Sequence, residues 1–213
     1  LYYVPLNQEY EVWFLEVTNC SDSARDFNIT GYAEFTNNSN YEQDQVNLQY
    51  SQFITRTVFQ ENRICQMIHG NLDGLEEGKD VDDKIVVERF FGLAGAGISS
   101  YCGDRESFLG RYHSYGNPLG VSCGELSGEL SYNENGCGAL TTRIQLEPGE
   151  TKHLAFVLGM KSSVEAERIL ERYQNIAKTC KTEQEELITY WHGKLSHFQV
   201  KTPSPEFDTM INT

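Results

Sequence analysis

The sequence has little positive charge: 17 Lys and Arg residues stand against 31 Asp and Glu residues, giving a formal net charge of −14 over 213 residues. Proteins that bind nucleic acids need clustered Lys and Arg to displace counterions from phosphates, and anionic membrane surfaces attract the same clusters. The balance of charge therefore argues against a nucleic-acid or membrane partner. The chain also lacks an apolar run long enough to span a bilayer.

The common catalytic and cofactor-binding motifs are missing as well. There is no P-loop and no GxSxG, and the glycine-rich run GLAGAG at 92–97 is not followed by the helix that a phosphate loop requires. The histidines lack the spacing of metal ligands, and the acidic run at 73–83 lacks that of a calcium loop, so we expect it to face solvent. We expect no metal and no cofactor. The six cysteines include no CxxC pair, which favours reduced thiols over a disulfide framework.

Up to about residue 160 the sequence has the pattern of strands. Segments rich in Val, Ile, Thr and aromatic residues are bounded by Asn, Ser, Asp and Gly. Many strands with long connections and little helix predict a mainly β fold, an antiparallel β-sandwich over 1–160, with the loops at 70–83 and 103–138 at the ends of the sheets. The predicted strands are 9–18, 27–36, 52–59, 85–91, 140–146 and 152–159.

The last two of these strands are joined by the sequence Glu147-Pro148-Gly149-Glu150. Pro at the first central position and Gly at the second are typical of a type II turn, because the Gly accepts a positive φ. We therefore expect 140–146 and 152–159 to pair directly as antiparallel neighbours.

After residue 160 the apolar period changes from that of strands to that of helices. Ser162 with Glu165, and Thr182 with Glu185, each form a capping-box signal, which predicts a two-helix linker over 161–198. The second helix carries Leu187, Trp191 and Leu195 on one face. The first is expected to bury Val164, Ile169, Leu170, Tyr173, Ile176 and Ala177.

The segment 199–213 begins a further unit. Pro203 and Pro205 interrupt any helix, and Phe207, Met210 and Ile211 then recur at the spacing of an amphipathic helix. A helix this short needs a continuation or a partner surface to be stable. We expect a larger protein, extending beyond this segment and also upstream of the strand-like opening LYYV.

The run DRESFLGRYHSYGNP at 104–118 combines arginines and aromatics in an unusual density. Arg105 and Arg111 offer several donors in a fixed plane, and aromatic rings such as those of Tyr112 and Tyr115 offer flat faces for the C–H surfaces of sugars. This mixture suits a hydroxyl-rich ligand. A surface loop with a few core aromatics is the alternative interpretation.

Four stretches, taken in order, resemble the inverting disaccharide phosphorylases, the family of cellobiose, cellodextrin and N,N′-diacetylchitobiose phosphorylases. They are YYVPLNQEYEVWFLEVTNCSD (2–22), DRESFLGRYHSYGNPLGV (104–121), LEPGETKHLAFVLG (146–159) and FQVKTPSPEFDTMINT (198–213). The resemblance implies an N-terminal β-sandwich, a helical linker and an α/α barrel that holds the active site, of which 199–213 would be the first turn. It also implies a small C-terminal sheet domain.

The resemblance implies reversible phosphorolysis of a β-linked glucose di- or oligosaccharide, cellobiose or a cellodextrin. Inorganic phosphate, a co-substrate, attacks the anomeric carbon while an Asp of the barrel protonates the leaving oxygen, which gives α-glucose 1-phosphate with inversion. Because phosphate is the nucleophile, one carboxylate suffices. We therefore expect no catalytic residue in this chain and no activity from it alone.

The same resemblance assigns sugar contact to Arg105, which matches the Arg of the family's D-R-x-x-F-hydrophobic-G motif. Arg111 and Tyr115, with Tyr112 and His113, follow in a part that varies among members, and they are the further candidates for substrate binding. The small-residue run GLAGAGISS at 92–100 replaces polar residues of cellobiose-specific members, which implies a more open acceptor site.

The resemblance further implies a homodimer in the cytoplasm, with the rest of the polypeptide as the sandwich's partner. A non-catalytic carbohydrate-binding β-sandwich module is the alternative function.

Overall fold

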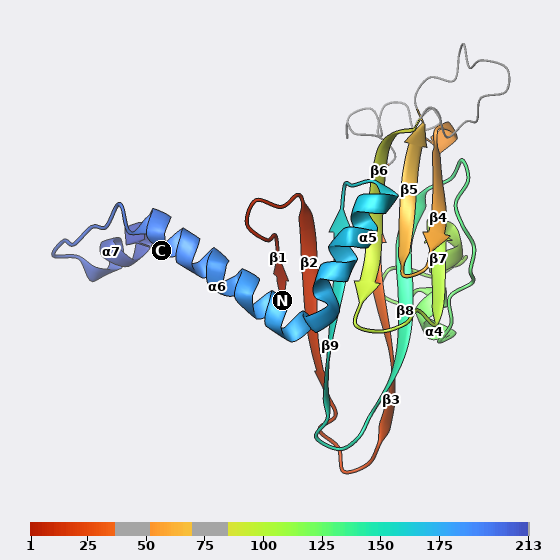
Figure 1. Cartoon of the computed structure of the whole chain (residues 1–213), viewed down its shortest axis with the longest axis horizontal. Coiled ribbons are helices and arrows are strands. Elements are labelled where there is room, and N and C mark those ends of the chain that lie inside the picture. Colours follow the sequence, from red (N-terminus) through yellow and green to blue (C-terminus); the bar gives the residue numbers. More distant parts are fainter. Residues whose placement is uncertain (37–51, 70–84, 213) are drawn as a thin grey trace.

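The computed structural model describes residues 1–36, 52–69 and 85–212. The described chain forms two antiparallel sheets packed face to face, with short helices on the outer face of each sheet and a long helix that leaves the sandwich (Figure 1). The larger sheet has the order β1-β2-β9-β6-β5-β4 and the smaller sheet the order β3-β8-β7. The mainly β sandwich expected from the sequence is thus present, and the acidic run at 73–83 lies outside the described residues.

The strands of the larger sheet are β1 (Tyr2–Tyr3), β2 (Tyr10–Thr18), β9 (Thr151–Gly159), β6 (Ile85–Ala94), β5 (Arg63–His69) and β4 (Thr55–Gln60). Those of the smaller sheet are β3 (Arg25–Glu34), β8 (Gly136–Leu146) and β7 (Ser100–Asp104).

The larger sheet is buried on both faces. One face meets the smaller sheet in a core that includes Phe91, Leu93, Phe156 and Leu140. The other face carries Phe90 and packs against the helices after β9. Alternate residues of one strand therefore enter two different cores, as the period of two requires.

Burial on both faces explains why β5 was missed from the sequence. Its residues RICQMIH are all buried, so they show no alternation of apolar and polar side chains. Three of them, Arg63, Gln66 and His69, are polar or charged, which hid the strand further. β7 was missed because its five residues include Gly103 and end at the start of a helix.

The expected pairing of 140–146 with 152–159 is wrong. The turn is there: Glu150 N donates to Glu147 O at 3.0 Å and Gly149 has a φ of 76°. However, β8 pairs with β3 and β7, whereas β9 pairs with β2 and β6. Both strands have apolar residues to bury, so the chain crosses at the turn and the strands face each other across the core instead of lying side by side.

The segment at 103–138 does not lie at a sheet end as expected. It contains two short helices, α3 (Arg105–Leu109) and α4 (Leu119–Ser122). Phe108 and Leu126 from this segment pack against Cys102, Cys137 and Ala139 of the smaller sheet. The segment therefore covers the sheet face that points away from the larger sheet.

The helical part begins as expected with a capping box at Ser162 and Glu165, followed by α5 (Ser163–Glu171). A 3₁₀ turn, η2 (Arg172–Asn175), leads into α6 (Ile176–Leu195), whose cap is Asn175. The second capping signal was wrong, since Thr182 lies inside α6. Val164, expected in the core, is exposed, because the buried face is formed by Ala166, Leu170, Tyr173 and Ile176.

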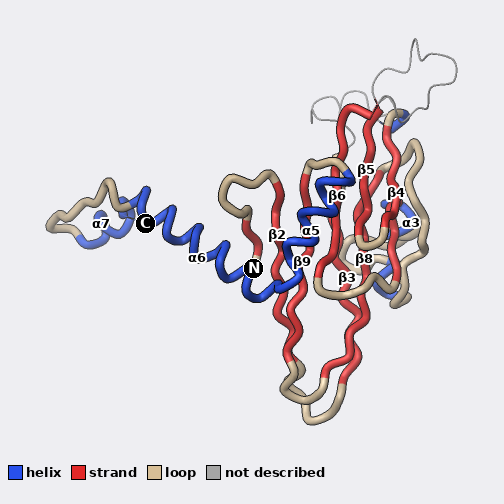
Figure 2. The backbone as a smooth tube through the Cα atoms, in the orientation of Figure 1, coloured by secondary structure: helices blue, strands red, loops and turns tan. Residues whose placement is uncertain are grey.

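Only the first part of α6 packs on the sandwich. Its first turns pack on the larger sheet, and the rest projects away from the sandwich to α7 (Pro205–Asn212) (Figure 2). Trp191 and Leu195, on the predicted apolar face, are more than half exposed.

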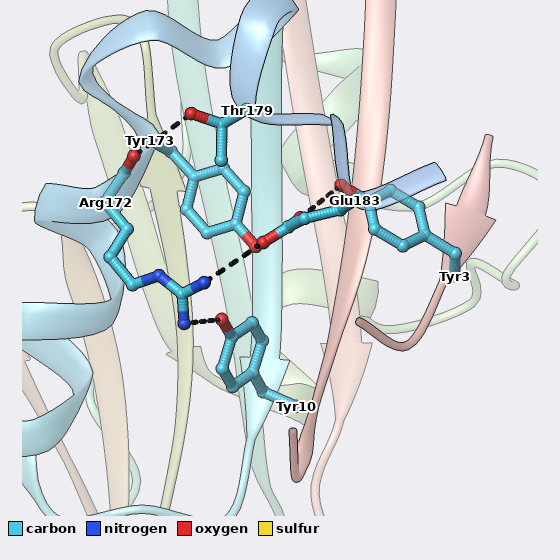
Figure 3. A network of polar contacts seen from close by, with 6 residues as sticks. All are labelled: Tyr3, Tyr10, Arg172, Tyr173, Thr179 and Glu183. Atoms are coloured by element: carbon cyan, nitrogen blue, oxygen red, sulfur yellow. Dashed lines mark hydrogen bonds and ion pairs between the residues drawn. The ribbon is translucent and has the colours of Figure 1, made fainter. Parts of the chain in front are cut away.

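A buried carboxylate fastens the start of α6 to the sandwich. Glu183 accepts hydrogen bonds from the hydroxyls of Tyr3 at 2.7 Å and Tyr173 at 3.0 Å, and pairs with Arg172 at 3.4 Å (Figure 3). Arg172 in turn donates to the Tyr10 hydroxyl at 2.9 Å. Burial, together with the nearby charge of Glu183, raises the pKa of Tyr3 and Tyr173 above the ordinary value, so both hydroxyls remain donors.

Candidate functional site

The motif at 104–110 folds as one capped turn of helix on the outer face of the smaller sheet. Asp104 caps α3 by accepting a hydrogen bond from Ser107 N at 2.7 Å. Phe108 is buried and stacks on Tyr32 with ring centroids 4.3 Å apart. Gly110 ends the helix with a φ of 80°, and a Cβ there would lie 2.6 Å from Leu119 Cβ. Asp104, Phe108 and Gly110 thus form the turn, and the side chain of Arg105 is not needed for it.

Arg105 is held by two partners through the same atom. Its Nε donates to the Tyr115 hydroxyl at 3.1 Å and pairs with Glu34 Oε1. The Tyr115 hydroxyl donates to the same Glu34 oxygen at 2.8 Å, which closes a triangle of contacts. We call Arg105, Tyr115 and Glu34 the Arg105 cluster.

The hydrogen bond to Tyr115 and the charge of Glu34 raise the pKa of Arg105 above its ordinary value. The guanidinium is therefore a permanent cation. A second carboxylate, Glu106, lies 3.7 Å from its Nη1. The cluster with its neighbour thus combines one positive charge with two negative ones.

The sheet register explains how Glu34 reaches a residue so distant in sequence. Glu34 pairs with Cys137 of β8, and Asp104 pairs with Gly136 on the other side of the same strand. The ends of β3 and β7 therefore lie level on either side of β8. Sequence reasoning missed Glu34, because only the strand order β3-β8-β7 brings it next to the motif.

Tyr115 lies next to stacked aromatic rings. Its ring is 6.3 Å from that of Tyr32, which itself stacks on Phe108, and the Arg105 Cζ atom is 5.9 Å from the Tyr115 ring centroid. Tyr115 is 55% exposed, so a ring face remains available to a ligand. The structure thus brings together two of the three predicted site residues, Arg105 and Tyr115.

The remaining candidates do not join the Arg105 cluster. Arg111 is exposed, and no hydrogen bond or ion pair is formed by its side chain within the described ranges. Tyr112 is fully exposed at a positive φ of 65°. His113 contacts Asn117 O at 2.9 Å and so belongs to the local turn. A role for Arg111 in binding stays a prediction.

Two buried thiols lie beneath the motif. A hydrogen bond from Cys137 lowers the pKa of Cys102 to about 7, and the same bond together with burial raises the pKa of Cys137. Cys102 also accepts from Ser127 Oγ at 3.4 Å. Both thiols are fully buried, so they support the turn and are not accessible nucleophiles. All six cysteines are free, as expected, although Cys20 and Cys123 are exposed.

The small-residue run at 92–100 serves packing. A Cβ at Gly92 would lie 2.6 Å from Leu170 Cδ1, and one at Gly95 would lie 2.3 Å from Ile176 Cδ1. The run ends at Ser100, the first residue of β7, whereas Arg105 follows the last residue of that strand. It therefore allows the helices to approach the sheet, and the structure does not place it beside the Arg105 cluster.

Within the described ranges, no group of three or more metal-ligating side chains gathers. Every helix in the same ranges is too short or too polar to span a bilayer. The chemistry that the Arg105 cluster can support therefore depends on the groups it contains, which are directed donors, an aromatic face and carboxylate acceptors. Groups of this kind can bind and orient hydroxyl-bearing molecules, and none of those in the cluster is arranged as a nucleophile with a base.

Comparison with known proteins matches residues 1–176 to the family described as glycosyl hydrolase 94, supersandwich domain. The chain is 31% identical over 211 residues to the N,N′-diacetylchitobiose phosphorylase of Vibrio proteolyticus, and 29% identical over 210 residues to that of Vibrio furnissii. Each alignment covers 99% of this chain and 24% of the relative. The 3-O-β-D-glucopyranosyl-β-D-glucuronide phosphorylase of Paenibacillus borealis is 34% identical over 113 residues, 53% of this chain and 15% of that protein. The chain thus spans about a quarter of the length of the first two curated relatives.

Proposed function

The chain belongs to the glycosyl hydrolase 94 supersandwich family, and on that premise we propose that it is the β-sandwich and linker part of a glycoside phosphorylase. The observation that carries the proposal is the similarity of 99% of the chain to two proteins named as phosphorylases. The complete enzyme would transfer a sugar from a β-linked di- or oligosaccharide to inorganic phosphate, reversibly and with inversion. The acid that protonates the leaving oxygen would lie outside this chain.

Two sugars are candidates for the transferred unit. The resemblance of the sequence suggests glucose, with cellobiose or a cellodextrin as substrate and α-glucose 1-phosphate as product. The names of the two relatives that match nearly the whole chain favour N-acetylglucosamine instead. Both belong in the first substrate panel.

In this proposal the Arg105 cluster supplies sugar contact. The Nη groups of Arg105 donate to hydroxyl oxygens, and the exposed face of Tyr115 packs on sugar C–H groups. Arg111 is a further, peripheral candidate. The exposure of Tyr115 and Arg111 and the directed donors of the partly buried Arg105 support these roles. The distances within the cluster support a fixed orientation of Arg105.

The rest of the same polypeptide, with an α/α barrel, is the proposed partner of the sandwich. A groove of about 480 Å³ between the segment Tyr3–Gln8 and α6 supports this, since Leu187, Tyr190 and Trp191 line it with apolar surface. A homodimer in the cytoplasm is proposed from the family resemblance. Inorganic phosphate is plentiful there, and a charged sugar phosphate would be retained.

The test is a phosphate-dependent substrate panel on the complete protein. Cellobiose, cellotriose and N,N′-diacetylchitobiose are incubated with and without phosphate, and the sugar 1-phosphate and free sugars are measured. We expect an α-sugar 1-phosphate from at least one of them, only with phosphate present. Free sugar without phosphate would identify a hydrolase, and sugar binding without any product would favour the carbohydrate-binding module.

A further inference from the structure

Glu34 holds Arg105 in a way that leaves the outer donors of the guanidinium free. The contacts of Glu34 and Tyr115 both fall on Nε, the donor nearest the aliphatic stem. In the described part of the chain, the Nη groups have only the ion pair of Nη1 with Glu106 at 3.7 Å, which is longer than a hydrogen bond. The two Nη groups thus present a fixed pair of donors.

The ion pair between Glu34 and Arg105 also determines the net charge next to a bound ligand. Arg105 alone would offer a full positive charge and would attract an acidic sugar as well as a neutral one. Glu34 touches the guanidinium and Glu106 lies beside it, so the three side chains sum to one negative charge. A carboxylate on the ligand is repelled by two carboxylates, whereas a neutral hydroxyl still accepts hydrogen bonds from Nη1 and Nη2.

We propose that Glu34 is a positioning and specificity-determining residue, which orients Arg105 through Nε and restricts the sugar at this site to a neutral one. The inference rests on the proposed phosphorylase function and deepens it by assigning the class of acceptor. Glu34 acts through Arg105 and does not touch the reacting atoms.

Two substitutions at Glu34 separate its charge from its hydrogen bonds. Glu34→Gln keeps an oxygen that accepts from the Tyr115 hydroxyl but removes the charge that pairs with Arg105. Glu34→Ala removes both. Glu147→Gln is the matched control, because Glu147 is exposed in the turn between β8 and β9 and has no side-chain partner within the described residues.

The experiment measures synthesis by the complete enzyme from the sugar 1-phosphate that the substrate panel identifies. The acceptors are glucose, N-acetylglucosamine and glucuronic acid, which differs from glucose by a carboxylate at C6. For Glu34→Gln we expect the ratio of kcat/KM for glucuronic acid to that for the better neutral acceptor to rise about fivefold, the effect of one partly exposed charge. For Glu34→Ala we expect KM for the neutral acceptor to rise about tenfold with kcat little changed, as lost orientation of a donor predicts.

Three outcomes overturn the inference. Equal loss of activity with all acceptors in both variants would give Glu34 a structural role only. An unchanged acceptor ratio in Glu34→Gln, matching Glu147→Gln, would exclude the role in specificity, and an unchanged KM in Glu34→Ala would exclude the role in positioning. The wild-type panel reports on the phosphorylase proposal separately, because an inactive wild-type enzyme fails with every acceptor before any variant is compared.

Discussion

Gly138 lies where β8 faces the ring of Phe91 across the core between the sheets. A Cβ at this position would lie 2.6 Å from Phe91 Cβ, a separation that real Cβ atoms do not adopt. Phe91 is fully buried and stacks on Phe156, so it has little freedom to move.

We expect Gly138→Ala to lower the free energy of unfolding of this chain by about 1–3 kcal/mol, the usual cost of overpacking a core. Urea titration of the wild type and the variant measures the change. Gly97→Ala is the control, since a Cβ there meets no atom within 4 Å. Equal stability of the two variants would show that the core at Phe91 yields more easily than the structure indicates.

The stability of the fold is also expected to depend on Glu183, because three polar side chains converge on its buried carboxylate. Its removal leaves the hydroxyls of Tyr3 and Tyr173 without their acceptor. We expect Glu183→Ala to cost about 3 kcal/mol and Glu183→Gln less, since the amide oxygen still accepts. Urea titration measures both against Glu186→Ala, an exposed position on the same helix expected to change stability by less than about 0.5 kcal/mol. A Glu183→Ala variant as stable as Glu186→Ala would rule out the proposed anchor.

At the scale of elements, the start of α5 was predicted from a local sequence pattern, and the structure has the expected capping box there. Ser162 and Glu165 were sufficient to predict its start, because a capping box needs only groups three residues apart. The Glu165 carboxylate accepts from Ser162 Oγ at 2.7 Å and Ser162 N at 3.1 Å, and these bonds lower its pKa below the ordinary value.

A lowered pKa makes this contribution dependent on pH. A carboxyl whose pKa is lower in the folded state stabilises the fold fully above its unfolded pKa of about 4.3, and the stabilisation is lost as the pH falls through the folded value. We expect the wild type to be more stable than Glu165→Gln at pH 7 and the difference to be smaller at pH 3, which lies below the unfolded pKa. Urea midpoints of both proteins at the two pH values measure it, and a difference independent of pH would contradict the assigned cause.

Elements that depend on distant contacts were predicted less well. The same capping pattern at Thr182 and Glu185 is overridden, because α6 already starts at Ile176 and continues through it. The turn at 147–150 was identified from its Pro and Gly, but which sheet each flanking strand joins depends on the core between them. β5, buried on both faces, gave no alternation to detect.

At the scale of the whole molecule, the sequence was enough to predict a sandwich followed by helices, since apolar period and turn residues act locally. The candidate site was predicted in part. Arg105 and Tyr115 are ten residues apart and were both identified, whereas Glu34 comes from β3 and becomes their neighbour only through the order of the smaller sheet. Arg111 was included on composition, yet it points to no partner within the described residues.

If the proposed function holds, the molecule as a whole is a scaffold that positions the donor groups of Arg105 for chemistry carried out by the rest of the polypeptide. Arg105 lies on a capped turn whose Phe108 is anchored in the sandwich, and its Nε is fixed by two partners. α6 projects away from the sandwich (Figure 1), and its apolar residues Trp191 and Leu195 are exposed there.

The most direct measurement is the steady-state kinetics of Arg105→Ala in the complete enzyme, compared with Arg143→Ala. Arg143 is an exposed arginine of β8 that pairs only with Asp26 among the described residues, at 3.1 Å, so its loss matches the change in charge. We predict that Arg105→Ala raises KM for the sugar about tenfold or more, the effect of losing one or two hydrogen bonds from a charged donor, with unfolding unchanged. Arg143→Ala should leave KM unaltered. Identical kinetics for both variants would contradict a sugar-binding role of the Arg105 cluster.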